Sequence, residues 1–332
     1  MTNPVLVNRL RGELVENRYR GAIAVSDARG KLIHRWGDTD ALVYPRSAIK
    51  LLQAIPLVES GAADHYALDR ARLALACSSH SAEPMHTDRV EKWLAQIGLD
   101  GDALECGADA PLDEATANHL LRQNQAFTRM HNNCSGKHTG MLTVSRFLDE
   151  PTRGYIDREH PAQQRWIDSL SAMTELDVRR LPWSYDGCGI PVIAMPLQSI
   201  AAAFARAAAP EALPAPRGQA IEALSEAIAE NPLMVAGSGR LGSEIISLCG
   251  ERILVKSGAD GVYTATIRGQ GIGIALKIDD GNGSAAEVAL LAVLQHLGLL
   301  RDDESRHLEA RIRVPIRNTR DILVGHLQAV SL

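Results

Sequence analysis

The sequence predicts a mixed α/β protein of the α+β type, with a mostly antiparallel sheet flanked by helices. Two groups of β-prone runs support this prediction. At 21–37, GAIAVSD and KLIHRWG are joined by Ala28-Arg29-Gly30, which is typical of a hairpin. At 252–278, three short apolar runs are separated by Gly and Asp. We therefore expect N- and C-terminal strands to pair in one sheet.

The residues between these strands have apolar side chains at helical spacing. This pattern covers about 47–250, and a further helix is expected at 284–300. With 332 residues, of which 45% are hydrophobic, the chain is long enough to bury a substantial core. We predict one catalytic domain over 1–332, with the helical part packed beside the sheet.

Charge and composition favour a small polar substrate. The net charge is -5, and Lys and Arg form no clusters of the kind that neutralise nucleic-acid phosphates. The N-terminal residues lack the apolar core of a signal peptide, and no segment approaches the roughly 18 apolar residues of a membrane span. Five cysteines fit a reducing compartment. We expect a cytoplasmic protein that binds neither nucleic acid nor membrane.

The segment Arg46-Ser47-Ala48-Ile49-Lys50 carries the first candidate for catalysis. Only six of the 35 basic residues are lysine, and lysine, unlike arginine, can lose its proton inside a protein. In a helix, Ser47 and Lys50 would lie on one face, which is the arrangement of a serine activated by a lysine. An isolated S-x-x-K is more often a helix cap followed by a solvated lysine, so this interpretation needs other motifs.

Two further segments supply such motifs. Cys77-Ser78-Ser79-His80-Ser81 follows an apolar run, and it fits either an ordinary helix cap or the wall of an active site. Lys256 ends a predicted strand and precedes Ser-Gly. This is similar to the K-[ST]-G element that accompanies S-x-x-K in penicillin-recognising serine hydrolases.

A third group of residues has the chemistry of zinc ligands. Cys134 and Lys137 lie three apart at a predicted helix start, and Asp186 and Cys188 share a glycine turn. Two thiolates, a carboxylate and a nitrogen can form a tetrahedral set. Lysine is an unusual ligand because it must be neutral, and each cysteine alone could be inert core. Asp279-Asp280-Gly281-Asn282-Gly283 fits a tight turn better than a metal site.

Taken together, these motifs resemble the L-asparaginases of the rhizobial, thermolabile type, the asparaginase II family. The matching segments run in the family's order over nearly the whole chain: VEN at 15–17, RSAIK at 46–50, CSSHSAE at 77–83, CG at 106–107, NNCSGKHTGML at 132–142, HP at 160–161, DGCGIP at 186–191, MVAGSGR at 234–240, KSGADG at 256–261 and KIDDGN at 277–282. Ser78 stands where a smaller residue is common in the family, and the tail at 301–332 matches nothing functional.

The resemblance implies a fold similar to serine β-lactamases and glutaminases. It also implies hydrolysis of L-asparagine to L-aspartate and ammonia by a homodimer without an organic cofactor. Zinc would be bound at Cys134, Lys137, Asp186 and Cys188. Two Ser-Lys pairs would serve the site, Ser47 with Lys50 and Ser79 with Lys256.

The expected roles follow from amide hydrolysis, which needs an activated nucleophile and an acid for the departing ammonia. We expect Ser47 to attack with Lys50 as base, while Ser79 and Lys256 relay protons. The reverse assignment, in which Ser79 attacks with Lys256 as base, uses the same residues. The residues expected to bind substrate are Arg46 and His80 at the α-carboxylate and Asp186 at the α-amino group.

Zinc at this set would position the substrate and tune nearby pKa values, because four protein ligands leave no place for a bound hydroxide. Two alternatives stay open. One is a penicillin-recognising or glutaminase-like serine hydrolase, and the other is a noncatalytic zinc or thiol sensor.

Overall fold

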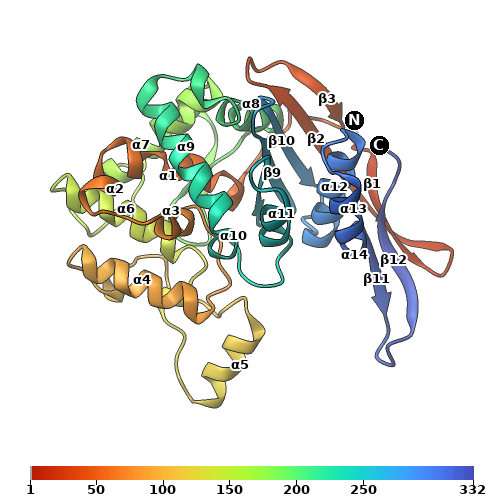
Figure 1. Cartoon of the computed structure of the whole chain (residues 1–332), viewed down its shortest axis with the longest axis horizontal. Coiled ribbons are helices and arrows are strands. Elements are labelled where there is room, and N and C mark those ends of the chain that lie inside the picture. Colours follow the sequence, from red (N-terminus) through yellow and green to blue (C-terminus); the bar gives the residue numbers. More distant parts are fainter. Residues whose placement is uncertain (1) are drawn as a thin grey trace.

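An eight-stranded antiparallel sheet runs through the protein, whose computed structural model describes residues 2–332 (Figure 1). The strands follow one another in the order β11-β12-β1-β2-β10-β9-β8, and β3 pairs with β2. Their bounds are β1 (Val5–Arg11), β2 (Leu14–Asp27), β3 (Leu32–Trp36), β8 (Ile253–Gly258), β9 (Val262–Ile267), β10 (Ile272–Ile278), β11 (Arg313–Arg317) and β12 (Leu323–Ala329). This confirms the predicted fold class.

The long strand β2 joins the two halves of the sheet. Its first half pairs with β1 and is largely exposed, whereas its second half pairs with β10 and is buried. Ala24 lies opposite Ala275 in that register, so the predicted pairing of N- and C-terminal strands is confirmed. At the change of partner lies Gly21, where a Cβ atom would come within 2.3 Å of the Lys277 carbonyl oxygen. Glycine is needed there because the backbones approach so closely.

The sheet is larger than the sequence predicts. Strands β1, β11 and β12 were not expected, and β11 and β12 form an antiparallel pair within the tail at 301–332 to which no role was given. Their burial is partial, and β1 and β11 carry arginines, so the apolar alternation of a half-buried strand is weak. Backbone pairing places them in the sheet: β1 pairs with β2, β12 with β1, and β11 with β12.

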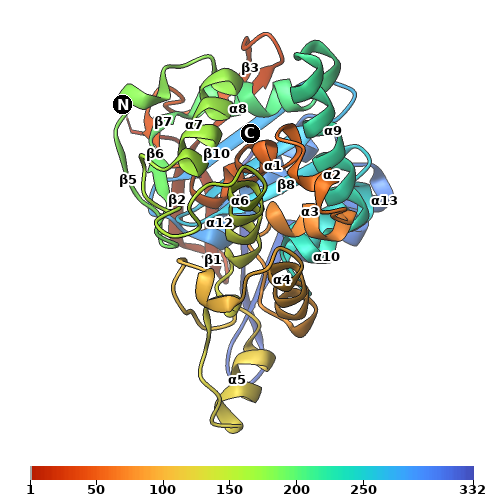
Figure 2. The ribbon, with the colours of Figure 1, turned by 90° about the vertical axis from the view of Figure 1, so that its left-hand side faces the viewer.

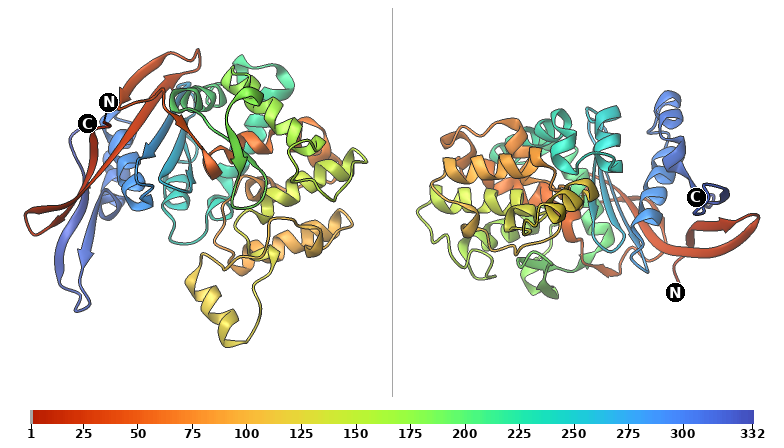
Figure 3. Two further views of the ribbon diagram at one scale, coloured as in Figure 1. Left: turned by 180° about the vertical axis from the view of Figure 1, so that it is seen from behind. Right: turned by 90° about the horizontal axis from the view of Figure 1, so that it is seen from below.

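The helical part lies on one side of the sheet (Figures 1 and 3). Its helices are α1 (Lys50–Glu59), α2 (Ala62–His65), α3 (Arg70–Ala76), α4 (Pro84–Gln96), α5 (Glu114–Arg122), α6 (Ser135–Phe147), α7 (Pro161–Thr174), α8 (Leu197–Ala207), α9 (Ala215–Glu230), α10 (Pro232–Val235) and α11 (Leu241–Cys249). The prediction of a helical middle is incomplete, because three short strands interrupt it: β5 (Trp183–Tyr185), β6 (Pro191–Ile193) and β7 (Met195–Pro196). A further short strand, β4 (Leu42–Val43), precedes it and pairs with β7.

Helix α8 connects the helical part to the sheet. It packs on β2 and β10, and a Cβ atom on Gly273 would lie 2.1 Å from the Ala201 carbonyl oxygen. Helix α12 (Gly283–His296) packs against β9, β10 and β12. It confirms the predicted C-terminal helix but ends four residues early, before Gly298, whose φ of +64° is a left-handed conformation that suits glycine. Beyond it lie α13 (Asp302–His307) and α14 (Glu309–Ile312).

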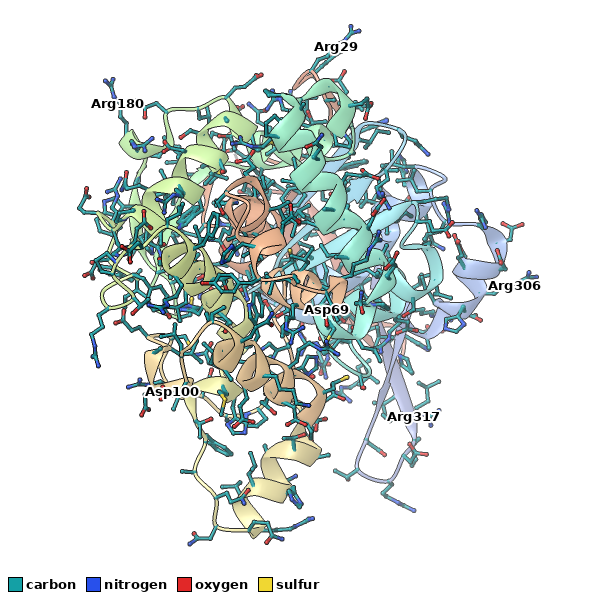
Figure 4. The ribbon with its side chains drawn as sticks, turned by 60° about the vertical axis from the view of Figure 1, so that its left-hand side comes forward. Arg29, Asp69, Asp100, Arg180, Arg306 and Arg317 are labelled. Carbon is teal, nitrogen blue, oxygen red and sulfur yellow. The ribbon has the colours of Figure 1, made fainter. Side chains whose placement is uncertain are left out.

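Two surface features complete the description. Helix α5 projects away from the body and buries no residue (Figure 2). Figure 4 shows Arg29, Arg180, Arg306 and Arg317 pointing outward from separate parts of the surface. Within residues 2–332, no helix combines the length and the hydropathy needed to cross a membrane.

Candidate active site

The hydroxyl of Ser79 lies between two lysine amines. Lys50 Nζ is 3.0 Å from Ser79 Oγ, and Lys256 Nζ is 2.9 Å from the same atom. Ser79 follows the end of α3, Lys50 is the first residue of α1, and Lys256 lies in β8. The three residues come from distant parts of the chain, and the contacts of α1 with α3 and of β8 with the turn before α1 bring them together.

Ser79 is held in this place by its backbone as well as by the amines. Its N–H donates to the Val235 carbonyl at 2.9 Å, so the C-terminal end of α10 supports it. Nearby, the Glu83 carboxylate accepts hydrogen bonds from the Ser81 hydroxyl at 2.6 Å and from the Ser238 N–H at 2.8 Å. Sequence reasoning gave Glu83 no role, although it belongs to the CSSHSAE segment. Through these hydrogen bonds Glu83 links the segment CSSHSAE to the segment MVAGSGR, which contains Ser238.

Lys256 is the amine whose environment most favours the neutral form. Burial and the adjacent positive charge of Lys50 hold the pKa of Lys256 well below its ordinary value of 10.5. Its side chain is only 8% exposed and lines an apolar cavity with residues such as Phe204 and Ile228. A neutral amine at 2.9 Å from a hydroxyl can accept its proton.

Among the described residues, no hydrogen bond joins the Ser47 hydroxyl to the Lys50 amine; the Lys50 backbone N–H donates to the Ser47 carbonyl oxygen instead. Arg46–Ile49 form a 3₁₀ turn, and α1 begins only at Lys50. The Lys50 amine turns inward, where it donates to the Ser78 carbonyl and lies 3.1 Å from Cys134 Sγ in addition to its contact with Ser79. Ser47 is half-buried beside the end of β8. The segment that carries Ser47 can lie this close to β8 because Gly258 has no side chain: a Cβ atom on Gly258 would lie 3.1 Å from Ala48 N.

Cys134, Lys137 and Cys188 form a buried cluster beside Lys50. Cys134 caps the N-terminus of α6, as predicted, and Lys137 Nζ lies 3.1 Å from Cys188 Sγ. Helix α6 can lie this close to α3 because Gly136 has no side chain: a Cβ atom there would be 2.4 Å from the Leu75 carbonyl oxygen. The sequence Cys-Ser-Gly-Lys thus places a thiol and an amine next to the Ser79 segment.

Charges within the cluster are paired. A hydrogen bond from the Cys134 thiol and the charge of Lys137 hold the pKa of Cys188 well below its usual value, which favours its thiolate form. The same hydrogen bond and burial raise the pKa of Cys134 to about 12. Burial opposes the charge of Lys137, but the two sulfurs raise its pKa.

The cluster has the composition of a zinc site with lysine as a ligand. No three His, Cys, Asp or Glu side chains gather as a metal site within residues 2–332, so the set depends on Lys137. Two donors on one tetrahedral zinc lie roughly 3.5 Å apart. The 3.1 Å between Lys137 Nζ and Cys188 Sγ is within a few tenths of this value. Lys137 and Cys188 are therefore spaced as two ligands of one zinc ion would be once the amine loses its proton, and Cys134 lies beside Lys50 in the same cluster.

Asp186 lies on the same turn as Cys188, but its carboxylate faces Arg46. Arg46 Nε donates to Asp186 Oδ1 at 2.7 Å, and the Gly187 N–H donates to the same oxygen at 2.8 Å. Burial raises the pKa of Asp186, but the charges of Lys137 and Arg46 outweigh it and lower the pKa. Arg46 also pairs with Asp260, a residue that sequence reasoning missed although it belongs to KSGADG.

His80 was expected to bind substrate, and its placement does not fit that role. The side chain is fully buried, its Nε2 lies 2.8 Å from Ser135 Oγ, and its Nδ1 accepts from the Ala82 N–H at 3.1 Å. Burial holds the pKa of His80 well below its usual value, so the ring is neutral. With both nitrogens engaged inside the protein, His80 is a positioning residue that joins the Ser79 segment to α6.

Comparison with protein families gives one match, to the model of L-asparaginase II, over residues 7–329. This chain belongs to the L-asparaginase II family. The family that the resemblance of its motifs predicted is thereby confirmed. No curated protein matches its sequence.

Among solved structures, the L-asparaginase II chain is similar to Mglu in its native form in the presence of 4.3 M NaCl, with 13% identity and a TM-score of 0.46. That match covers 86% of this chain but only 63% of Mglu. A β-lactamase from Mycobacterium bovis is similar with 14% identity and a TM-score of 0.42, covering 83% of this chain and 94% of that one.

Proposed function

We propose that this member of the L-asparaginase II family hydrolyses L-asparagine to L-aspartate and ammonia through an acyl-enzyme. The observation that carries the proposal is the position of Ser79 Oγ, 3.0 Å from Lys50 Nζ and 2.9 Å from Lys256 Nζ. A hydroxyl between two amines, one of them neutral, passes a proton from one amine to the other. This supplies the base that an amide hydrolase needs.

In the proposed first step, the Ser79 hydroxyl gives its proton to neutral Lys256 and takes one from Lys50. Neutral Lys50 then accepts the proton of Ser47 as Ser47 Oγ attacks the side-chain carbonyl carbon of asparagine. We expect the hydrogen bond between Ser47 and Lys50 to form when the substrate binds, because catalytic hydrogen bonds often form only in the substrate complex. Ser47 suits the attack because it is half-buried and three residues from that amine.

In the second step, the carbonyl π bond re-forms and the C–N bond breaks. Lys50 returns its proton to the departing nitrogen, which leaves as ammonia, and an ester joins Ser47 Oγ to the β-carbonyl. In the third step, a water molecule gives a proton to neutral Lys50 and attacks the ester carbonyl carbon. The Ser47 oxygen takes that proton from Lys50 as it leaves, the new β-carboxylic acid gives its proton to the released ammonia, and Ser79 relays a proton from Lys256 back to Lys50, so that aspartate is released and the resting state is restored. Atoms and charges balance, and no organic cofactor is required.

The remaining expectations stand as proposals beside this one. Cys134, Lys137 and Cys188, with Asp186 nearby, would hold zinc. Bound there, the ion would supply a positive charge that orients the substrate and favours neutral amines. Arg46 would bind the substrate α-carboxylate after that group displaces one of the two aspartates that pair with Arg46. We also propose a homodimer in the cytoplasm.

The test is ammonia release from L-asparagine, L-glutamine and D-asparagine by the purified protein. L-Asparagine should be the preferred substrate, and Ser47→Ala and Ser79→Ala should each abolish turnover. Mass spectrometry after rapid acid quenching should find the acyl group on Ser47. An adduct on Ser79 would reverse the roles of the two serines, whereas no ammonia from L-asparagine would reject the proposal.

A penicillin supplies the control for the alternative serine hydrolase. Acylation by a penicillin with no amidase activity would indicate a penicillin-recognising enzyme. For a noncatalytic zinc sensor, Ser47→Ala should leave the function of the protein intact.

A further inference from the structure

Asp260 lies at the tip of the turn between β8 and β9, four residues beyond Lys256. Its φ is +59° and that of Gly261 is +71°, so two successive residues adopt the left-handed conformation. A non-glycine residue in this conformation is uncommon outside Asn and Asp. The turn projects the Asp260 side chain, which is 64% exposed, toward Arg46.

The turn is fixed by the segment KIDDGN. Lys277 Nζ donates to the Asp260 carbonyl oxygen at 2.6 Å, and the Ile278 N–H donates to the Gly261 carbonyl at 2.9 Å. A Cβ atom on Gly261 would lie 3.0 Å from the carbonyl carbon of Gly281. The Asp260 carboxylate is therefore held at a set position relative to β8, the strand that carries Lys256.

Arg46 lies between two carboxylates, those of Asp186 and Asp260. Its own φ is +52°, so a left-handed residue immediately precedes Ser47. The three side chains sum to one negative charge. A free α-amino acid carries a carboxylate and an ammonium group, and it adds no net charge when one group pairs with Arg46 and the other with an aspartate.

We propose that Asp260 receives the α-ammonium group of the substrate while Arg46 receives the α-carboxylate, so that Asp260 sets the preference for free α-amino acids. This inference rests on the proposed asparagine hydrolysis and replaces Asp186 in the role first expected for it. Substrate exchanges partners with the resting ion pairs: its carboxylate displaces Asp260 from Arg46, and its ammonium group takes up the displaced carboxylate.

Exposure distinguishes the two aspartates. The Asp186 side chain is only 12% exposed, and its Oδ1 already accepts from Arg46 and Gly187. The Asp260 carboxylate pairs with Arg46 and its side chain is 64% exposed, so an incoming ligand can reach it without breaking a buried network. Exchanging a buried pair would leave an unpaired charge inside the protein, which is costly.

The test compares ligands with and without the α-ammonium group. L-Aspartate and succinate are measured by titration calorimetry, and L-asparagine and succinamate by ammonia release. Asp260→Asn keeps the left-handed backbone but removes the charge. We expect it to weaken L-aspartate binding and raise the KM for L-asparagine roughly 10- to 100-fold. Succinate binding and the KM for succinamate should not worsen, because Arg46 loses a competing carboxylate.

Asp280→Asn is the matched control, since Asp280 is an exposed aspartate close in sequence to Gly281, which packs on the Asp260 turn. It should change neither ligand's affinity. Equal weakening of both ligand classes by Asp260→Asn, or an unchanged preference for the amino acids, would overturn the inference. The calorimetric comparison needs no turnover, so wild-type protein that binds L-aspartate but releases no ammonia would reject the proposed function alone.

Discussion

Lys256 Nζ lies 2.9 Å from Ser79 Oγ, and this amine is the one whose burial favours the neutral form. The pair joins the C-terminal sheet to the helical part at a hydroxyl that also contacts Lys50. Most consequences for the chemistry of this protein follow from that contact.

The activity of the protein should rise with pH through the pKa of Lys256. Only the neutral amine can accept the Ser79 proton, and burial together with the charge of Lys50 lowers its pKa. The rising limb of kcat/KM should therefore have its midpoint well below 10.5. The positive charge of Arg240 contributes to this lowering, so Arg240→Gln should move the limb to higher pH. An unchanged midpoint of the rising limb in Arg240→Gln would contradict the assignment of this limb to Lys256.

Stability should also rise with pH from the lowered pKa of Lys256 up to about 9. In this range the unfolded chain binds one more proton at this amine, so the free energy of unfolding increases by up to about 1.4 kcal/mol per pH unit, whereas above about 9 the raised pKa of Cys134 acts in the opposite direction. The lowered pKa of Cys188 acts in the same direction up to about its ordinary value of 9.0. Lys256→Met should reduce this slope and stabilise the protein at neutral pH, as urea unfolding at several pH values can measure.

Gly237 should be essential for the support of Ser79. Its φ is +113°, and a Cβ atom there would lie 1.9 Å from Ser81 Oγ and 2.6 Å from Glu83 Oε1. Gly237→Ala should cost about 3 kcal/mol of stability, because it overfills the site as well as straining the backbone. Activity should fall further than stability alone explains.

Gly239→Ala is the control for that experiment. Its φ of +68° is also left-handed, but nothing lies within 4 Å of a Cβ atom there. We expect a loss of only about 1 kcal/mol, with near-normal activity of the folded fraction. Equal effects of the two substitutions in thermal unfolding and ammonia release would show that the contact with Ser81 and Glu83 is unimportant.

Zinc should bind with a stoichiometry of one per chain and release protons on binding. Lys137 and Cys134 both hold protons in the metal-free protein, since their pKa values are raised, and both must lose them to become ligands. Affinity should therefore increase with pH. Cys188→Ser should reduce it at least tenfold, whereas Cys249→Ser, at a buried thiol that donates to the Ile245 carbonyl, should not. Equilibrium dialysis followed by elemental analysis measures both, and equal affinities of these variants would exclude the cluster as the site.

Part of the fold could be read from the sequence because it depends on local patterns. Gly and Asp punctuate β8, β9 and β10, and the hairpin residues before Lys31 mark β2 and β3. Strands β1, β11 and β12 could not be read, because only a few of their side chains, such as Leu6, Val7 and Leu327, are buried and the apolar alternation is weak.

The sequence by itself determined the candidate residues for the chemistry: a serine with a lysine three residues on, a second Ser-Lys pair, and two cysteines with a lysine. Only the tertiary structure decided how they meet. Lys50 reaches Ser79 in place of Ser47, because α1 starts at Lys50 and its long side chain points into the protein. His80 turns inward toward Ser135, and Asp260 joins Arg46 from 214 residues away. Spacing along a chain fixes local neighbours, whereas contacts between segments depend on how helices and sheet pack.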